Sequence, residues 1–330
     1  MLIKVNNLSK SFKIFKRKPG IKEAFKSFLK RDYYLFHALS DIDLNVNEGE
    51  ILGILGENGA GKTTLIKLII GLLHPTSGTI LVDDYIPWER NHKYLKKVSV
   101  VMGQKNQLWW DIPASESFLL NQKIYEIPEI QYKNTLDELV DLLSVREKLN
   151  VQVRRLSLGE RMKMEFIAAL LHRPKIVLLD EPTIGLDVIS QLKIREFVKY
   201  YNEKYKTTFL LTSHYMHDIQ ALCKRVFVIH KGASLYDGDF NDLVNRVNPK
   251  RKLLFEFNET PDHKKIEKLS ENYNFSLNDT ILYAELPDKE LTKLVSELFQ
   301  LGVPASITME DLPVEDTMRS FFKDPEKFLK

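Results

Sequence analysis

One glycine-rich stretch of the sequence has the composition of a phosphate-binding loop. The stretch is Gly56-Glu57-Asn58-Gly59-Ala60-Gly61-Lys62-Thr63, followed by Thr64. Its glycines let the backbone turn so that N–H groups point at phosphate oxygens, and a following helix adds the positive end of its dipole. Lys62 would reach the β- and γ-phosphates, and the Thr63 hydroxyl would bind Mg²⁺. The strand-like run EGEILGIL precedes the loop and the helical run TTLIKLIIGLL follows it, which is the setting such a site requires.

Two neighbouring carboxylates end a second apolar run and suit the same chemistry. Asp180 and Glu181 follow KIVLL, a run typical of a buried strand. Because successive strand residues point to opposite faces of a sheet, we expect these two side chains to serve different purposes. Asp180 is expected beside Thr63 in the shell of a Mg²⁺ ion. Glu181 would face elsewhere and polarise an attacking water.

The elements that position these residues alternate between strand and helix patterns. Strand-like runs occur at EILGIL, KVSVVM, KIVLLD, TTFLLT and RVFVIH, with helical patterns between them. This alternation predicts an α/β core with a mainly parallel sheet over residues 1–248. A mostly helical block at about 105–171 predicts a helical subdomain. Residues 249–330 hold the strand-like runs KLLFEF, TILYAEL and ASITM between helical patterns, and they predict a small accessory α+β domain.

Composition and charge limit the class of protein. With 44% hydrophobic and 28% charged residues, the chain is typical of a soluble globular protein. No apolar run approaches the ~20 residues that cross a bilayer, and the opening MLIKVNNLSK predicts no secretory signal. The single cysteine, Cys223, fits a reducing cytoplasm. The net charge of +3 is local, because residues 13–36 hold eight basic and two acidic side chains, so we expect no nucleic-acid partner.

The order of these motifs resembles that of the ATP-binding subunits of ABC transporters over residues 1–240. GENGAGKTT resembles the Walker A loop and KIVLLDE the Walker B strand, which implies a P-loop NTPase fold. The resemblance also implies that Gln104, in VVMGQKNQ, is a metal ligand that senses the γ-phosphate and contacts a transmembrane partner. Asp187, in GLD, would belong to the D-loop, and His214, in LLTSHYMHDI, would be the switch histidine. Glu181, His214 and Gln104 would then carry catalysis.

A variant of the family signature keeps the same order. Ser157-Leu158-Gly159-Glu160 stands where the family has Ser-Gly-Gly-Gln. The resemblance implies that this segment closes over nucleotide held by a second cassette, and that it uses the Ser157 hydroxyl and the Gly159 backbone. Ser157 and Glu160 also fit an S-x-x-E capping box, which predicts that the Glu160 carboxylate folds back onto the start of its own helix. We therefore expect an active site, and S-L-G-E-R resembles one branch of drug-exporter ATPases.

Aromatic residues are candidates for two further contacts. MGQKNQLWWDIPASESF resembles a segment of exporter ATPases paired with type-2 exporter permeases, so Trp109 and Trp110 are candidates for gripping a permease's cytoplasmic helix. Packing in the core is the alternative for both. By its spacing after LSK, Phe12 is the residue expected to stack on adenine. The insert that follows leaves three other candidates for that role, which are Tyr33, Tyr34 and Phe36.

The basic insert has the pattern of an interfacial helix. Apolar side chains at 21, 25, 28 and 29 share one helical face, and the lysines at 18, 22, 26 and 30 share another. This pattern predicts contact between residues 18–31 and anionic lipid. A solvated helix packed on the protein's own sheet is the alternative.

The resemblance implies an ATP-hydrolysing motor subunit of an ABC exporter, with ATP and Mg²⁺ as its cofactors. Its partners would be integral-membrane permease subunits and a second cassette, which is either a second copy or a sibling chain. The subunit would be cytoplasmic and peripheral on the inner face of the cell membrane. Two alternatives stay open: an import cassette, which shares the ATP-site residues, and a soluble ABC ATPase without a permease.

Overall fold

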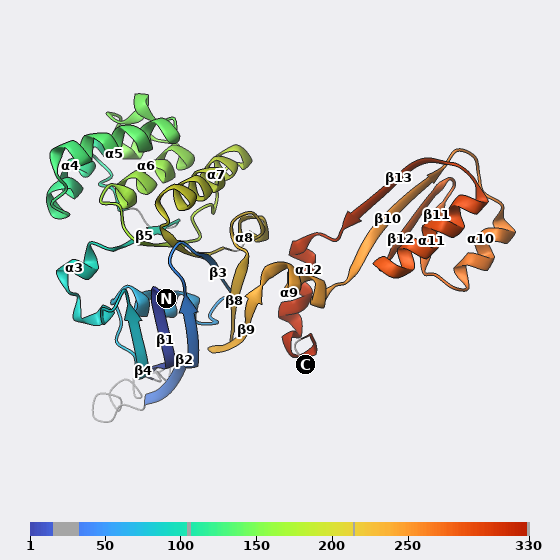
Figure 1. The fold of residues 1–330 in the computed structure, drawn as a ribbon, viewed down its shortest axis with the longest axis horizontal. Helices are drawn as coiled ribbons and strands as arrows, with labels where there is room; N and C mark the ends of the chain where they lie inside the picture. Colours follow the sequence, from blue (N-terminus) through green and yellow to red (C-terminus); the bar gives the residue numbers. More distant parts are fainter. Residues whose placement is uncertain (16–32, 104–106, 214, 329–330) are drawn as a thin grey trace, which may run out of the picture. The chain divides into compact units, whose positions relative to one another are not determined.

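The computed structural model describes residues 1–15, 33–103, 107–213 and 215–328. The chain forms two compact units, Met1–Asp239 and Phe240–Lys330 (Figure 1). The second unit therefore begins before the boundary that we expected between residues 248 and 249. Helix α9 (Phe240–Val247) accounts for the difference, because it packs against helix α12 (Val314–Lys323) within the second unit.

A six-stranded sheet forms the centre of the first unit. In spatial order its strands are β5 (Val98–Met102), β6 (Ile176–Asp180), β7 (Thr208–Thr212), β3 (Ile51–Leu55), β8 (Arg225–His230) and β9 (Ala233–Asp239). The first five strands are parallel, and β9 runs antiparallel to β8. The prediction of a mainly parallel sheet is thus confirmed. Strand β9 was not expected, because ASLYDGD has no regular alternation of apolar and polar residues.

A smaller antiparallel sheet and one helix complete the core of this unit. The sheet has the order β2 (Tyr33–Val46), β1 (Ile3–Phe15) and β4 (Ser77–Val82), and helix α2 spans Lys62–Ile69. Apolar residues of both sheets and of α2 form one buried cluster, in which Leu8, Ile66 and Leu178 are at most 1% exposed. Burial at this level stabilises each aliphatic side chain by about 1.5–3 kcal/mol. The loop between β3 and α2 is thereby held between two rigid elements.

The remaining helices of the first unit include the group predicted from the sequence at about 105–171. These helices are α3 (His92–Leu95), α4 (Ala114–Ile124), α5 (Glu129–Leu142), α6 (Leu158–Leu170), α7 (Val188–Tyr205) and α8 (Met216–Leu222). Short 3-10 turns lie at Pro87–Glu89, Arg146–Lys148 and Val153–Arg155. Helices α4, α5 and α6 lie together in Figure 1, drawn in green, to one side of the central sheet.

The second unit has the element order of a split βαβ fold. Its elements are β10 (Lys250–Phe257), α10 (His263–Ser270), β11 (Phe275–Asn278), β12 (Ile281–Pro287), α11 (Asp288–Leu301) and β13 (Pro304–Asp311), with α12 and a 3-10 turn at Pro325–Lys327 after them. The sheet order β11-β12-β10-β13 is antiparallel throughout, as in ferredoxin-like domains. Leu253 and Phe255 alternate inward from β10 and share a core with Leu294 of α11. Strand β11 was not expected, because it has only four residues.

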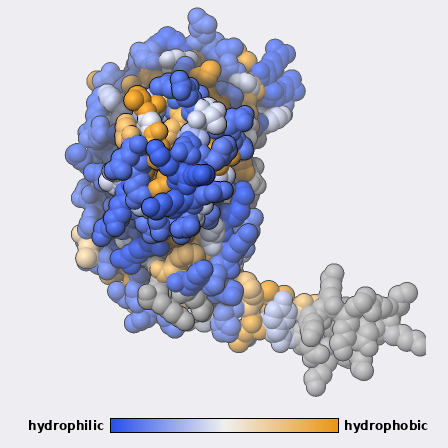
Figure 2. Space-filling model, turned by 90° about the vertical axis from the view of Figure 1, so that its right-hand side faces the viewer, coloured by the Kyte–Doolittle hydropathy of each residue, from blue (hydrophilic) through white to orange (hydrophobic). Residues whose placement is uncertain are grey.

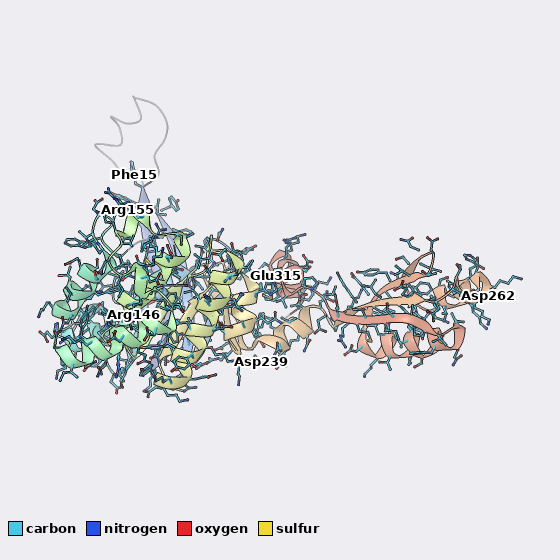
Figure 3. The ribbon with its side chains drawn as sticks, turned by 90° about the horizontal axis from the view of Figure 1, so that it is seen from above. Phe15, Arg146, Arg155, Asp239, Asp262 and Glu315 are labelled. Atoms are coloured by element: carbon cyan, nitrogen blue, oxygen red, sulfur yellow. The ribbon has the colours of Figure 1, made fainter. Side chains whose placement is uncertain are left out.

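The surface of the described chain carries many polar side chains, which Figure 3 draws as sticks with Phe15 labelled at the described end of β1. Hydrophilic residues cover most of the face in Figure 2, and apolar residues form smaller patches between them. Among the described residues, no helix combines the length and apolar character needed to cross a membrane.

Candidate nucleotide-binding site

The glycines of the loop between β3 and α2 are required by close backbone packing. A Cβ atom on Gly56 would lie 2.3 Å from the carbonyl oxygen of Ile229. One on Gly61 would lie 2.6 Å from Leu39 Cδ2, and Gly61 also has a φ of 117° at the N-cap of α2. Both distances are shorter than any side chain tolerates, so the loop can take this path only with glycine. The first turn of α2, which begins at Lys62, then presents its free N–H groups to the loop.

The loop borders a cavity of about 230 Å³ that gathers most of the predicted site. Its lining consists of Phe36, Ala38, Asn58, Gly59, Gly61, Lys62, Thr63, Thr64, Asp180 and Glu181. The strands and α2 thus bring together two segments that are more than a hundred residues apart in the sequence. Ala60 is buried instead, and its carbonyl accepts the N–H of Gly232 at 3.0 Å, which anchors the loop to the turn after β8.

Lys62 extends back across the loop. Its Nζ donates to the carbonyl oxygens of Gly56 at 2.7 Å and Glu57 at 3.0 Å. Burial lowers the pKa of Lys62, and the nearby Glu181, Asp180 and Glu57 carboxylates partly oppose that shift. A lysine ammonium in a glycine-rich loop suits an anionic phosphate chain. The negative charge of the phosphates would favour the protonated form of Lys62, which its burial disfavours.

Asp180 and Glu181 face the same cavity, which corrects our expectation that they face apart. Strand β6 ends at Asp180, and Glu181 lies beyond it with a left-handed φ of 53°. The strand alternation therefore stops before Glu181, and its side chain turns back to the site. Asp180 Oδ1 accepts the Thr212 hydroxyl at 2.6 Å, while the Glu181 N–H donates to the Thr212 carbonyl at 2.9 Å. Neighbouring strand β7 thus fixes both acids.

The donor set in the cavity fits a Mg²⁺–nucleotide complex. Thr63 offers a hydroxyl and Asp180 a carboxylate, and Mg²⁺ binds few protein oxygens when phosphate oxygens complete its shell. Gln104 was predicted as a further ligand, but it lies outside the described residues, as does His214. The residue before Gln104 does reach the site, because the Gly103 N–H donates to the Asp180 carbonyl at 2.9 Å.

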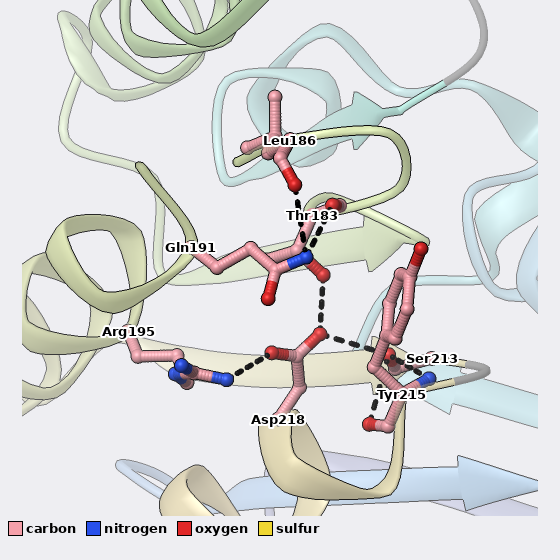
Figure 4. A network of polar contacts seen from close by, with 7 residues as sticks. All are labelled: Thr183, Leu186, Gln191, Arg195, Ser213, Tyr215 and Asp218. Carbon is pink, nitrogen blue, oxygen red and sulfur yellow. Dashed lines mark hydrogen bonds and ion pairs between the residues drawn. The ribbon is translucent and has the colours of Figure 1, made fainter. Parts of the chain in front are cut away.

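A buried hydrogen-bond network beside the site was missed by sequence reasoning (Figure 4). Asp218, on α8, is 1% exposed, and its Oδ2 accepts the hydroxyls of Thr183 and, at 2.9 Å, Ser213. Its Oδ1 pairs with Arg195 of α7 at 3.0 Å. The Tyr215 N–H donates to the Ser213 hydroxyl at 3.0 Å, so the network holds residues on both sides of position 214. No motif marks Asp218, since its partners come from three other segments.

The signature segment forms the predicted capping box. The Glu160 N–H donates to Ser157 Oγ at 3.2 Å, and the Ser157 N–H donates to Glu160 Oε2 at 2.9 Å. Lys148 Nζ lies 3.1 Å from the other carboxylate oxygen. The hydrogen bond from the Ser157 backbone is the main cause that lowers the pKa of Glu160. The carboxylate is therefore occupied at its own helix terminus, as the sequence predicted.

Gly159 and Leu158 pack against the start of helix α7. A Cβ on Gly159 would lie 2.5 Å from Ser190 Oγ, so only glycine fits there without movement. Leu158 Cδ2 occupies the space beside Gly185, whose own Cβ would meet it at 3.1 Å. Asp187 is the N-cap of α7 and accepts the Ser190 N–H at 2.9 Å and its hydroxyl at 2.6 Å. The signature segment and the Asp187 turn thus form one packed unit.

An aromatic residue lines the nucleotide cavity, and it is Phe36. This residue was one of the three candidates kept beside Phe12. Phe12 pairs with Phe36 across β1 and β2, and Lys10 Nζ lies 5.1 Å from the centre of the Phe12 ring. Opposed residues of an antiparallel pair share a face of the sheet, so the two rings lie on one side of the hairpin.

A second cavity, of about 450 Å³, lies apart from the nucleotide loop. Its lining includes the apolar residues Leu95, Val100, Met102 and Ile124 and the basic residues Arg90 and Lys96. Gln107 also borders it, and the exposed Trp109 and Trp110 follow shortly after in the chain. The 61% and 44% exposure of these two tryptophans excludes core packing as their main use.

Comparison with known proteins supports the same assignment. A family model described as ABC transporter matches residues 39–184. The ABC transporter ATP-binding protein NatA of Bacillus subtilis is 36% identical over 206 residues, 62% of this chain and 83% of NatA. The bacitracin transport ATP-binding protein BcrA of Bacillus licheniformis is 30% identical, covering 72% of this chain and 75% of BcrA. The linearmycin resistance ATP-binding protein LnrL of B. subtilis is 32% identical, covering 66% and 70%.

Import proteins and solved structures also match. Methionine import ATP-binding protein MetN 2 of Bacillus cereus is 32% identical over 69% of this chain and 68% of its own. A structure of an ATP-binding subunit of an ABC transporter superposes with a TM-score of 0.61 at 24% identity, covering 74% of this chain and 92% of that chain, and it shows the fold. The relatives, the family model and the cavity agree. This chain belongs to the ABC transporter family, as an ATP-binding and ATP-hydrolysing subunit that uses Mg²⁺ and works with membrane permeases.

Proposed function

We propose that this chain is the motor of an exporter and that its described cavity is the ATP site. The observation that carries the proposal is that Lys62, Thr63, Asp180 and Glu181 line one cavity at the carboxyl ends of β3 and β6. Lys62 and the loop N–H groups hold the phosphates, while Thr63 and Asp180 hold Mg²⁺. Glu181 orients and polarises the attacking water. Catalysis of this kind is positioning plus charge stabilisation.

The residues outside the described chain complete this proposal. Gln104 and His214 contact the γ-phosphate, and Gln104 also contacts Mg²⁺. Each follows the end of a strand, β5 or β7, that neighbours β6 in the sheet. Stacking on adenine is the role proposed for Phe12 or Phe36, and the presence of Phe36 in the cavity lining favours the latter.

A second cassette completes each ATP site in this proposal. Ser157 is exposed at the N-terminus of α6, where a hydroxyl and free N–H groups can meet the γ-phosphate of a partner's nucleotide. Next to it, the start of α7 exposes Val188 (76%), Ile189 (68%) and Leu192 (50%). Apolar side chains that gather on an exposed surface are typical of protein–protein contact sites. The partner is a second copy or a sibling cassette.

Permease contact is proposed at the second cavity and the tryptophan pair. The cavity is apolar with Arg90 and Lys96 on its border, which suits a short amphipathic helix that carries acidic side chains. Trp109 and Trp110 follow the cavity residue Gln107 in the chain and have large exposed rings. Tryptophan is enriched at interface hot spots. Closing and opening of the cassette pair would move this helix.

Export is the direction that the relatives favour. Two relatives carry the names bacitracin transport and linearmycin resistance, and the segments S-L-G-E-R and MGQKNQLWWDIPASESF resemble the exporter branch. The methionine import relatives keep import as the second candidate. The basic residues 18–31 lie outside the described residues, and their contact with anionic lipid on the inner face of the membrane stays part of the proposal.

A pull-down from native membranes tests the proposal. Tagged chain carrying Glu181→Gln, with ATP and Mg²⁺, should trap the closed cassette pair and bring its membrane partner with it. Lys62→Ala provides the matched control, because it should fail to bind nucleotide and lose the second cassette from the eluate. Mass spectrometry should identify a polytopic permease. Recovery of a substrate-binding protein would favour import, and recovery of soluble partners alone would contradict the transporter role.

A further inference from the structure

Glu165 is a buried carboxylate that no step of ATP hydrolysis uses. It lies on α6, about two turns after Ser157, and it is 2% exposed. Its Oε1 accepts the backbone N–H groups of Gln107 at 3.0 Å and Leu108 at 3.3 Å, and its Oε2 accepts that of Gln107 at 3.2 Å. A buried carboxylate is expensive, and burial raises the pKa of Glu165 despite these bonds. The contacts that offset this cost are the ones to the backbone of residues 107 and 108, so Glu165 holds that segment.

Arg161, one turn earlier on α6, adds a second contact to the same segment. Its guanidinium carbon lies 5.1 Å from the centre of the Trp110 ring, within range of a cation–π interaction. The Trp110 carbonyl also accepts the Arg154 N–H at 3.0 Å, and Asp111 pairs with the Arg154 guanidinium at 3.1 Å. The tryptophan segment, residues 107–110, is therefore attached to α6 and to the turn before it.

We propose that Glu165 is a positioning residue that fastens the tryptophan segment to α6, so that Trp109, Trp110 and the signature residue Ser157 move as one body. Helix α6 runs without interruption from residue 158 to 170, so a displacement at its N-terminus reaches Glu165 undiminished. The inference rests on the proposed closure of the signature over a partner's nucleotide. It adds the residue through which this closure would move Trp109 and Trp110, the side chains proposed to contact the permease.

The tryptophans themselves report the coupling. The chain has three tryptophans, so Trp88→Phe leaves Trp109 and Trp110 as the only residues that emit when the excitation is selective for tryptophan. In full-length chain that also carries Glu181→Gln, addition of ATP and Mg²⁺ should drive dimerisation, measured by size-exclusion chromatography, and shift the tryptophan emission. Glu165→Ala in this background should abolish the emission shift while ATP still drives dimerisation.

A control separates fastening from general weakening of the helices. Glu138→Gln, on α5, loses a carboxylate that pairs with Lys204 at 2.8 Å and accepts the Tyr205 hydroxyl, and it should keep the emission shift. An undiminished shift in Glu165→Ala, or a dimer that forms with no shift in the parent, would overturn the inference and leave the proposed function standing. Absence of the dimer in the parent would instead exclude a second copy as the partner, and the hydrogen-exchange measurement would then decide the inference.

Hydrogen exchange tests the same idea without a substitution at Glu165. The amides of Gln107 and Leu108 should exchange slowly, and ATP should slow them further together with the first turn of α6. Exchange of these two amides at the rate of an open loop would refute the fastening even if Glu165→Ala failed to fold.

Discussion

The contact between Gly159 and Ser190 yields a prediction whose sign depends on a second residue. In Gly159→Ala the new Cβ would lie 2.5 Å from Ser190 Oγ and 3.1 Å from Ser190 Cβ. The hydroxyl cannot simply rotate away, because it donates to Asp187 Oδ2 at 2.6 Å. Overpacking of this kind costs about 1–3 kcal/mol. Alanine gains only about 0.5–1 kcal/mol over glycine in a helix, so the net loss should lie within about 0–2.5 kcal/mol.

A double-mutant cycle in urea isolates the clash. Ser190→Gly removes both atoms that the added Cβ would meet, so Gly159→Ala should become neutral or stabilising in that background. Ser190→Ala removes only the hydroxyl and should relieve part of the loss. ATP turnover need not return with stability, because the signature backbone also approaches a partner's nucleotide. Equal costs of Gly159→Ala in the parent and in Ser190→Gly would refute the packing argument.

Three further predictions follow from buried charges and rings. Burial lowers the pKa of His172 to about 4, so below pH ~6.5 the unfolded chain binds a proton that the folded chain does not, and the free energy of unfolding should fall by up to about 1.4 kcal/mol per pH unit. His172→Phe keeps a ring stacked on Tyr125 and should reduce this loss in urea titrations. The same pH dependence of unfolding in both proteins would contradict the prediction. Asp218→Ala should lower the free energy of unfolding by about 3 kcal/mol or more, against less than about 1 kcal/mol for the exposed Asp141→Ala. Lys62→Ala should weaken binding of a fluorescent ATP analogue about tenfold or more, since hydrogen bonds to charged groups contribute about 1.5–3 kcal/mol; unchanged affinity would place the phosphates elsewhere.

Features set by neighbouring residues could be predicted from the sequence. The capping box of Ser157 and Glu160 needs only an S-x-x-E spacing, and the structure has both of its hydrogen bonds. The loop from Gly56 to Lys62 was found in the same way, because its glycines and lysine act within a few residues. The parallel sheet followed from the alternation of strand and helix patterns.

Features set by distant contacts could not be predicted. Glu181 follows a strand without a break in the sequence, and only its left-handed φ of 53° turns it into the cavity beside Asp180. Phe36 borders the cavity because β2 pairs with β1 in a register that no local pattern records. Two partners of Asp218, Arg195 and Thr183, lie 23 and 35 positions away, and the nearer Ser213 forms no recognisable motif with it.

Leu158 and Glu160, the two residues that differ from the family signature, have different structural roles. Leu158 lies beside Gly185, on the turn that precedes α7. A glycine at position 158 would leave empty the space that Leu158 Cδ2 fills beside Gly185. Glu160 is held by the Ser157 N–H and by Lys148, so its charge is directed to its own helix terminus. A negative charge near the N-terminus also stabilises α6 by about 0.3–1 kcal/mol. Both changes therefore strengthen the attachment of the signature segment within its own chain, and neither removes the Ser157 hydroxyl or the Gly159 backbone that a partner's nucleotide would meet.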